Sequence, residues 1–300
     1  MGIPFVKDFT FEYGVCQSIS PLIDRLVADN PGPFTYTGTG VYIVGDKNVA
    51  VIDPGPATPN HKAALAKALE GRRVTHVLVT HHHIDHSPMA KPLAEEHGCM
   101  VYGYGLQARP PEGGEIRLEA GDDLGFKPDV EICDGLKING DGWTIEAIHT
   151  PGHTSNHMCY ALHEENVLFS GDHIMGWSTS VVSPPDGHMG DYLNSLGRIL
   201  DRNFDRIIPT HGPVIENAPE FVQAYIDHRL DREQQICEAL SEGLTDITDI
   251  VLRLYTDIDK RLHPAAAHSV LAHIIHLRET GRIEGDGPDG LKTAYRLKAA

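Results

Sequence analysis

The sequence predicts an α/β fold for most of the chain, followed by a small unit of helices and a hairpin. Between residues 41 and 102, β-type runs alternate with helical patterns. Within this region the run 74–79 is almost continuously apolar, as in a strand that is buried on both faces. Beyond about residue 217 long helical patterns take over. We therefore expect one domain over residues 1–217 and a second over residues 218–300.

Length and composition agree with a protein that buries a core and has no membrane segment. The chain has 300 residues, 41% of them hydrophobic, and no run of 18 apolar residues. Residues 1–6 lack the basic-then-apolar pattern of a signal peptide. Five cysteines, an odd number without CxxC spacing, suit reduced thiols rather than a disulfide framework. We expect a cytoplasmic protein.

The charge of the chain bears on its partners. The formal net charge is −17 at pH 7, which disfavours a protein that wraps long nucleic acid by bulk electrostatics. This charge is still compatible with binding of a short single strand of nucleic acid through metal ions. We therefore expect a small-molecule substrate rather than single-stranded RNA.

The first half of the chain predicts strands and helices in alternation. Residues 1–35 carry weak signals, apart from a turn at 30–33. Ser87 is expected to cap a helix with Pro88 at its first position, and Gly98 to end it. The other elements expected are a hairpin of residues 41–44 and 49–52, a helix over 57–70, and strands over 74–79 and 99–102.

The second half predicts further strands and then the helical unit. Up to residue 217 we expect strands over residues 115–118 and 143–148, a hairpin of 158–162 and 167–170, a helix over 191–200 and a strand over 206–208. Helices over residues 219–243, 246–255 and 264–280, followed by a hairpin of 281–284 and 291–297, predict a winged helix.

The most informative stretch is residues 80–86, THHHIDH, directly after the apolar run 74–79. Imidazole and carboxylate groups are good ligands of zinc and similar ions. His81 and His83 are two apart, so an extended backbone would point them the same way, whereas Asp85 and His86 would diverge toward a second ion. The alternatives are a solvated loop, a tag, a single ion or a surface cluster. The internal position, between a strand and a helix start, argues against a tag.

Three later loops that follow β-type runs also carry histidine or aspartate. They hold His153, Asp172 and His211. Ends of different strands can converge on one edge of a sheet. Each of these residues alone would be an ordinary polar loop residue, but together with residues 80–86 they predict one metal site.

Other polar residues near these loops have ordinary explanations. Asp53 ends a strand, where a turn residue is the default interpretation and support of the histidine loop is the alternative. His82 points opposite to its neighbours and stays outside the predicted site. For His149, His157 and His173 we expect ordinary hydrogen bonds.

These residues together resemble the metallo-β-lactamase superfamily. Its HxHxDH motif matches residues 81–86, and its further motifs match Asp53, His153, Asp172 and His211. The resemblance implies an αββα four-layer metallo-β-lactamase sandwich, to which the small winged-helix domain is added. It also implies two metal ions, and it assigns their ligands as His81, His83 and His153 for one ion, Asp85, His86 and His211 for the other, and Asp172 for both.

A narrower resemblance is to the endoribonuclease β-lactamase-like protein 2 branch. It rests on residues 30–35, on the helix 191–200, on His228-Arg229 with residues 232–236, and on the C-terminal winged helix. The loop 176–188 departs from that branch by its prolines, which leaves the substrate open.

The resemblance implies a binuclear metal-dependent hydrolase, in which a hydroxide bridging the two ions attacks the substrate and Asp85 orients it. All donors are nitrogen or oxygen, which permits zinc, manganese or iron, with zinc as the default. We expect an ester, thioester or lactone of small size as the substrate. An endoribonuclease acting on single-stranded RNA and a non-enzymatic metal-binding module are the alternatives. For the C-terminal unit, a lid over the site and a homodimer contact are the two alternatives, and a nucleic-acid contact is disfavoured.

Overall fold

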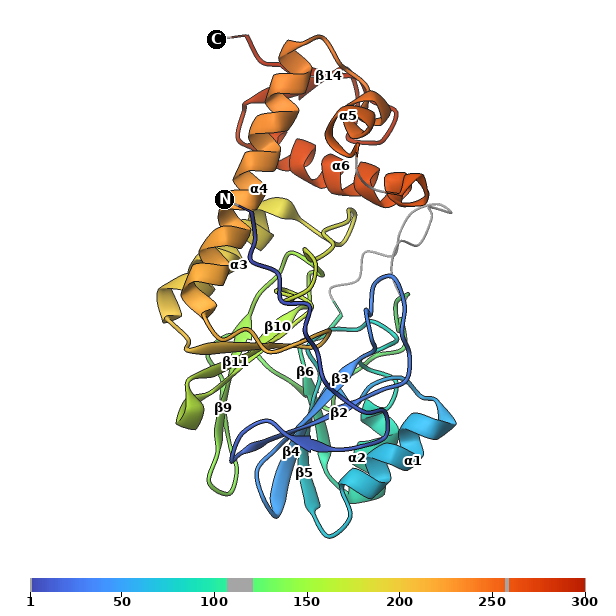
Figure 1. Ribbon diagram of the computed structural model, residues 1–300, viewed down its shortest axis with the longest axis vertical. Coiled ribbons are helices and arrows are strands. Elements are labelled where there is room, and N and C mark those ends of the chain that lie inside the picture. Colours follow the sequence, from blue (N-terminus) through green and yellow to red (C-terminus); the bar gives the residue numbers. More distant parts are fainter. Residues whose placement is uncertain (1, 107–120, 257–258, 300) are drawn as a thin grey trace.

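The computed structural model of the protein describes residues 2–106, 121–256 and 259–299. Figure 1 shows two parts, a body built on two β-sheets and a smaller C-terminal unit above it. The long helix α4 (Ala218–Ser241) runs from the body into that unit. Its first turns pack in the core of the body and its last turns in the core of the C-terminal unit. The boundary between residues 217 and 218 stays a prediction.

Among the described residues, the first sheet has seven strands, which follow the order of the chain. Its strands are β1 (Gln17–Ser18), β2 (Ile23–Val27), β3 (Gly40–Val44), β4 (Asn48–Ile52), β5 (Arg73–Leu78), β6 (Met100–Gly103) and β7 (Val130–Glu131). β1 to β4 are antiparallel neighbours, and β4 to β7 are parallel. Parallel neighbours need a crossover, which α1 (Pro59–Ala68) and α2 (Ala90–His97) supply after β4 and β5.

The second sheet has five strands in the order β12-β11-β10-β9-β8. The strands are β8 (Lys137–Asn139), β9 (Thr144–His149), β10 (Met158–Leu162), β11 (Val167–Gly171) and β12 (Arg206–Pro209). A short 3-10 helix, η1 (His163–Glu165), joins β10 to β11. β12 is parallel to β11, and the helix α3 (Met189–Arg202) makes the crossover between them.

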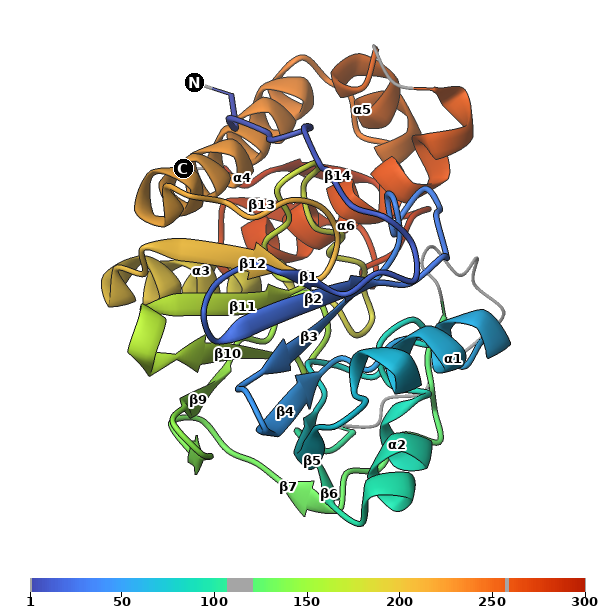
Figure 2. The same ribbon diagram turned by 60° about the horizontal axis from the view of Figure 1, so that its bottom comes forward.

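The two sheets lie face to face between two helical layers (Figure 2). Tyr42 and Trp143, both fully buried, belong to the core between the sheets. α1 and α2 cover the free face of the first sheet, and α3 with α4 covers that of the second. The αββα sandwich expected from the sequence is confirmed.

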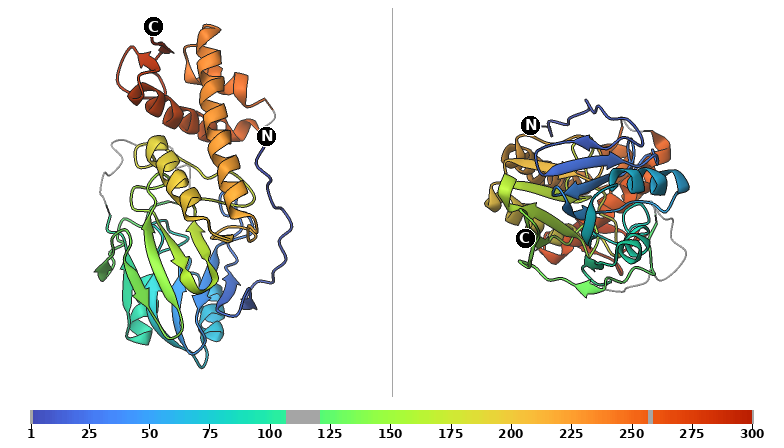
Figure 3. Two further views of the ribbon diagram at one scale, coloured as in Figure 1. Left: turned by 90° about the vertical axis from the view of Figure 1, so that its left-hand side faces the viewer. Right: turned by 90° about the horizontal axis from the view of Figure 1, so that it is seen from below.

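The C-terminal unit has its own core, in which Ile236 of α4 packs with Val251, Ile274 and Tyr295. Its elements are α5 (Ile247–Leu254), the 3-10 helix η2 (Lys260–Leu262), α6 (His263–Glu279), β13 (Ile283–Gly285) and β14 (Tyr295–Leu297). The two strands pair antiparallel, and Figure 3 shows the unit resting on the end of α4 away from the sheets. This arrangement confirms the expected winged helix. In the described part of the chain, no helix has the length and apolar character needed to cross a bilayer.

Two local expectations differ from the structure. β2 lies in the region of weak sequence signals, because Asp24 and Arg25 interrupt its apolar pattern. The helix expected after Ser87 begins instead at Ala90, and no side chain caps it. The Ser87 hydroxyl donates to Asp123 Oδ2 at 2.8 Å, so it faces another loop. The strand expected at residues 115–118 lies outside the described residues.

Candidate metal centre

The seven residues proposed from the sequence as metal ligands all lie at one edge of the two sheets. Residues 80–86 follow β5, His153 lies in the turn between β9 and β10, and Asp172 and His211 follow β11 and β12. All seven side chains are buried. Segments far apart in the sequence therefore meet at a single point of the fold.

Asp53, directly after β4, holds these loops together. Its Oδ1 accepts the backbone N–H of Thr80 at 2.8 Å. Its Oδ2 accepts the hydroxyls of Thr80 and Thr210 at 2.8 and 3.2 Å, and lies 2.9 Å from His86 Nδ1. The residue adopts a φ of 47°, which an L side chain rarely does. These contacts favour the supporting role over that of an ordinary turn residue.

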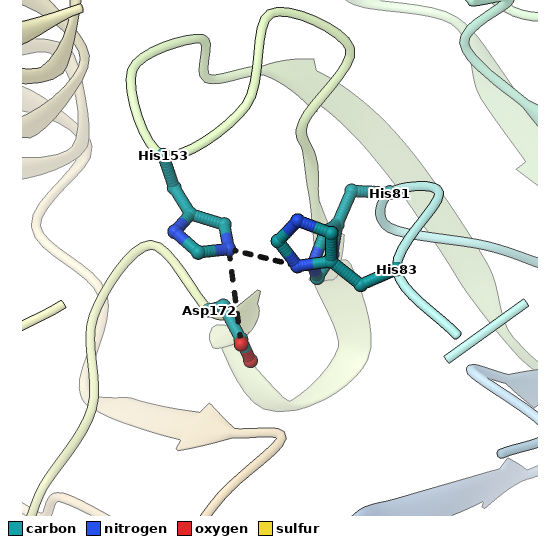
Figure 4. Close-up of side chains that lie close together, drawn as sticks. All are labelled: His81, His83, His153 and Asp172. Atoms are coloured by element: carbon teal, nitrogen blue, oxygen red, sulfur yellow. Dashed lines mark hydrogen bonds and ion pairs between the residues drawn. The ribbon is translucent and has the colours of Figure 1, made fainter. Parts of the chain in front are cut away.

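The first group of candidate donors is His81, His83, His153 and Asp172 (Figure 4). His81 Nε2 lies 2.8 Å from His83 Nδ1, and His153 Nε2 lies 3.3 Å from the same nitrogen. His153 Nε2 is also 3.9 Å from Asp172 Oδ2. Figure 4 shows the His83 and His153 rings and the Asp172 carboxylate directed toward a common point. Three imidazoles and a carboxylate in this arrangement can hold one cation.

The second group is Asp85, His86 and His211. Asp85 Oδ2 lies 3.4 Å from His86 Nε2 and 3.3 Å from His211 Nε2. Asp172 Oδ1 lies 3.5 Å from the same nitrogen of His86 and 3.3 Å from that of His211. One oxygen of Asp172 thus faces each group, as required of a carboxylate that bridges two ions.

The donor atoms fit two divalent cations. Within each group they lie within 4.8 Å of one another. His86 Nε2 and Asp172 Oδ1 are buried and form no hydrogen bond within the described part of the chain. A buried polar atom without a partner is costly, and a cation between these two atoms would satisfy both. The donors are nitrogen and oxygen only, which suits zinc, manganese or iron.

The other ring nitrogens of four of these histidines are held by hydrogen bonds. Such partners fix the direction in which an imidazole presents its free nitrogen to a metal. The contacts join His81 Nδ1 to Thr80 Oγ1 at 2.9 Å, His86 Nδ1 to Asp53 Oδ2 at 2.9 Å, His153 Nδ1 to Val181 O at 2.7 Å, and His211 Nδ1 to Gly38 O at 3.1 Å.

The two groups differ in electrostatics. Burial, together with His86 and His83, lowers the pKa of His81 well below its ordinary value. Burial acts in the same direction on His211, but Asp172 and Asp85 outweigh it and raise the pKa of His211 to about 10. Binding of a cation by the second group therefore has to displace a proton, whereas His81 is already neutral.

The remaining histidines fall outside both groups. His82 Nδ1 lies 2.9 Å from Asn156 Oδ1, consistent with its exclusion from the site. His149 Nε2 bonds to Ser155 O, as expected. His157 accepts the backbone N–H of Asp172 at 3.2 Å, which orients a candidate ligand. The expectation is wrong for His173, because neither of its ring nitrogens has a hydrogen-bond partner among the described residues.

A cavity opens beside the donor groups. Its lining combines five of the candidate donors with Phe34, Met175 and Val181. Close to Gly212, Trp177 stacks on Tyr36 with ring centroids 4.8 Å apart. The sequence did not identify these apolar residues, because single apolar residues in loops carry no periodic signal.

Comparison with known proteins agrees with the fold and the site. Residues 36–211 match the model of the metallo-beta-lactamase superfamily, and residues 247–289 match that of the beta-lactamase associated winged helix domain. The chain therefore belongs to the metallo-beta-lactamase superfamily, whose members are generally metal-dependent hydrolases.

Curated relatives and solved structures add detail. The chain is 32% identical over 278 residues to the beta-lactamase-like protein 2 homolog of Caenorhabditis elegans, covering 89% of this chain and 88% of that protein. It is 34% identical over 231 residues to an atrochrysone carboxyl ACP thioesterase of Aspergillus chevalieri, covering 76% and 68%. A metallo-beta-lactamase family protein of Thermus thermophilus superposes with a TM-score of 0.72 at 21% identity, covering 94% and 100%. The narrower resemblance to the β-lactamase-like protein 2 branch is thus confirmed.

Proposed function

We propose that the protein is a binuclear metal-dependent hydrolase of small thioesters, or of related esters and lactones, with apolar acyl groups. The observation that carries this proposal is the apolar wall of Phe34, Met175 and Val181 beside the candidate donors. An apolar wall at a hydrolytic centre favours a substrate whose carbonyl carries a hydrophobic chain or ring. The relative from Aspergillus chevalieri is named as a thioesterase, which supports the same reaction class.

The proposed ligand set follows the two donor groups. His81, His83 and His153 would hold one ion, Asp85, His86 and His211 the other, and Asp172 both. We propose zinc, which accepts imidazole and carboxylate ligands. When bound, two such ions supply an activated water and neutralise the charge that develops on the carbonyl oxygen.

Asp85 acts on the attacking water in this proposal. Its Oδ2 accepts a hydrogen bond from the Thr39 hydroxyl at 3.3 Å, which fixes the carboxylate against the wall of the cavity. From there Asp85 can accept a hydrogen bond from the water and aim its oxygen at the carbonyl carbon. The new C–O bond forms, the C–S bond breaks, and the water proton ends on the leaving sulfur. The products are a carboxylic acid and a thiol.

The same wall disfavours single-stranded RNA as the substrate. Among the described residues that line the cavity there is no lysine or arginine to meet a phosphate. In α6, Arg278 is the one fixed positive charge, and it is paired with Asp289. A winged helix that reads nucleic acid needs free cationic side chains on its recognition helix.

A substrate panel on zinc-loaded protein tests the proposal. It contains thioesters of increasing acyl size, the matching oxygen esters, a lactone and a single-stranded RNA. We expect turnover of the thioesters, with kcat/KM rising with the apolar size of the acyl group. Phe34→Ala should lower kcat/KM for the largest acyl group by about tenfold and leave the acetyl thioester nearly unchanged. Leu252→Ala, at an exposed position of α5, is the control.

Two outcomes would contradict the proposal. Cleavage of the RNA without thioester turnover would establish the endoribonuclease alternative. Tight zinc binding without turnover of any member of the panel would favour the non-enzymatic metal-binding module.

A further inference from the structure

One face of α4 carries three polar side chains that are buried along the length of the helix. Tyr225, Arg229 and Glu233 are spaced four residues apart, so they lie on the same side of the helix. Their exposed fractions are 0%, 3% and 2%. We call these three residues the polar stripe. Burial of an arginine and a glutamate is costly unless each is matched by specific partners, so the contacts of the stripe show what it holds.

At one end the polar stripe holds the loop that follows Asp172. Tyr225 Oη lies 2.6 Å from the carbonyl oxygens of both Met175 and Ser178, and it accepts the N–H of Met175 at 3.1 Å. One turn further along α4, Arg229 Nη2 donates to the carbonyl of Ser180 at 2.5 Å. Two residues of one helix face therefore fix three points of this loop.

The next residue of that loop, Val181, faces the candidate metal centre. Its carbonyl oxygen lies 2.7 Å from His153 Nδ1, and its side chain lines the cavity together with that of Met175. The carbonyl that Arg229 holds and the carbonyl that orients His153 thus belong to adjacent residues.

The same segment is braced from α3. The Ser180 hydroxyl donates to His173 O at 2.8 Å, and Tyr192 Oη donates to the same oxygen at 2.6 Å. The guanidinium of Arg229 lies over the Tyr192 ring, 5.1 Å from its centroid. Arg229 therefore lies between the loop and Tyr192 of α3.

At the other end the polar stripe is tied to the winged helix. Glu233 Oε1 lies 2.6 Å from His276 Nδ1 of α6, and Oε2 lies 3.1 Å from a guanidinium nitrogen of Arg282. Both carboxylate oxygens thus bind groups of the C-terminal unit. The stripe joins that unit to the wall of the cavity through one rigid helix.

We infer that Arg229, supported by Tyr225 and Glu233, is a positioning residue for the metal centre. It sets the backbone of residues 180–181, and through the Val181 carbonyl it sets the direction of the His153 ring. The winged helix then stabilises the hydrolytic site, because through α4 it holds the loop that follows Asp172 in place. This inference rests on the proposed metal ligands, but its test does not depend on the substrate.

The test is zinc affinity, measured by competition with a chromophoric chelator, in the full chain. We expect Arg229→Gln to weaken by about tenfold the binding of the zinc ion that His153 would hold, because loss of an outer hydrogen-bond partner of a ligand has effects of this order. Arg229→Lys, which keeps the charge, should recover part of the loss. Arg232→Gln is the matched control: Arg232 lies on the same helix, but its guanidinium rests 4.3 Å from the Tyr255 ring in the C-terminal unit. It should bind zinc like the wild type.

Circular dichroism shows whether each variant folds. If Arg229→Gln does not fold, Tyr225→Phe takes its place, because it keeps the ring and removes only the hydroxyl. Folded Arg229→Gln or Tyr225→Phe protein with wild-type zinc affinity would overturn the inference, and so would an equal loss in Arg232→Gln. Wild-type protein that binds no zinc would instead contradict the proposed function.

Discussion

The described residues contain two buried clusters of histidine and carboxylate, and the partners of these clusters differ. In the C-terminal unit both oxygens of Glu233 are paired, with His276 and with Arg282. At the sheet edge, His86 Nε2 and Asp172 Oδ1 face each other at 3.5 Å without a hydrogen bond. Residue types alone therefore do not define a metal centre. A carboxylate with both oxygens paired stabilises the fold, whereas imidazole and carboxylate atoms that converge on one point without hydrogen-bonding one another can hold a cation.

The largest effect should come from Asp172→Ala. This change removes the one carboxylate that faces both donor groups and leaves His86 and His211 without its charge. We expect hydrolysis to fall to the background rate and the bound zinc to fall below two equivalents. Asp201→Ala, at an exposed position near the end of α3, is the control. Activity that survives Asp172→Ala would show that the two clusters do not differ in the way described.

Asp53→Asn should have the next largest effect. The amide that replaces the carboxylate has one acceptor oxygen, whereas Asp53 accepts from Thr80 and Thr210 and binds His86 Nδ1. We expect zinc affinity at the second group to fall about 10- to 100-fold with the fold retained. Chelator competition and circular dichroism measure both quantities. Unchanged zinc affinity would show that Asp53 is an ordinary turn residue.

Glu233→Gln should act chiefly on stability and leave two zinc ions bound, because Glu233 acts on the metal centre only indirectly, as a support of Arg229. The change leaves Arg282 and His276 without a negative partner, and we expect the free energy of unfolding to drop by about 2 kcal/mol. Urea unfolding measures this loss. Zinc stoichiometry should stay at the wild-type value. Full loss of zinc in a folded Glu233→Gln protein would contradict the contrast between the clusters.

The smallest expected difference between the two clusters is in how stability and zinc binding depend on pH. Burial opposes ionisation of Glu233, but hydrogen bonds from His273 and His276 outweigh it and lower its pKa to about 2. Its contribution to stability is therefore present above about pH 4.3, the ordinary glutamate value, and is lost as the pH falls toward 2. The hydrogen bond to Glu233 raises the pKa of His276. That contribution is present below about pH 6.5 and is lost as the pH rises through the raised value.

The metal centre should respond at a different pH. Ligand imidazoles must be neutral, and zinc has to displace the proton of His211, whose pKa is raised to about 10. Zinc affinity should therefore fall steadily as the pH drops below about 10, and bound zinc and activity should be lost together in mildly acidic solution. Urea midpoints and zinc content measured from pH 3 to 8 should therefore show zinc loss while Glu233 still stabilises the fold. If zinc stays bound down to the pH at which the protein unfolds, the prediction is wrong.

The sequence predicts the candidate donors well because they follow strands. The apolar runs that become β5, β11 and β12 end next to polar loops, and parallel strands bring such ends to one edge. The histidine spacing at residues 81–86 also indicates which side chains face the same way. Sequence reasoning could thus name the seven donors before any distance between them was known.

Other parts of the site could not be predicted. Phe34, Met175 and Val181 come from irregular loops, where no periodicity shows which way a side chain points. The polar stripe of α4 is visible in the sequence as a spacing of four, but the partners of Tyr225 and Arg229 are backbone carbonyls of a distant loop. Backbone acceptors have no signature in a sequence. β2 was missed for a related reason, since Arg25 at its centre is buried only through tertiary contacts.

Native mass spectrometry of the intact protein, loaded with zinc and desalted, tests the central claim most directly. The account predicts two zinc ions per chain in the wild type and fewer than two in Asp172→Ala. A wild-type chain that holds one ion or none, in folded protein at pH 7.5, would contradict the assignment of the two donor groups to a binuclear centre.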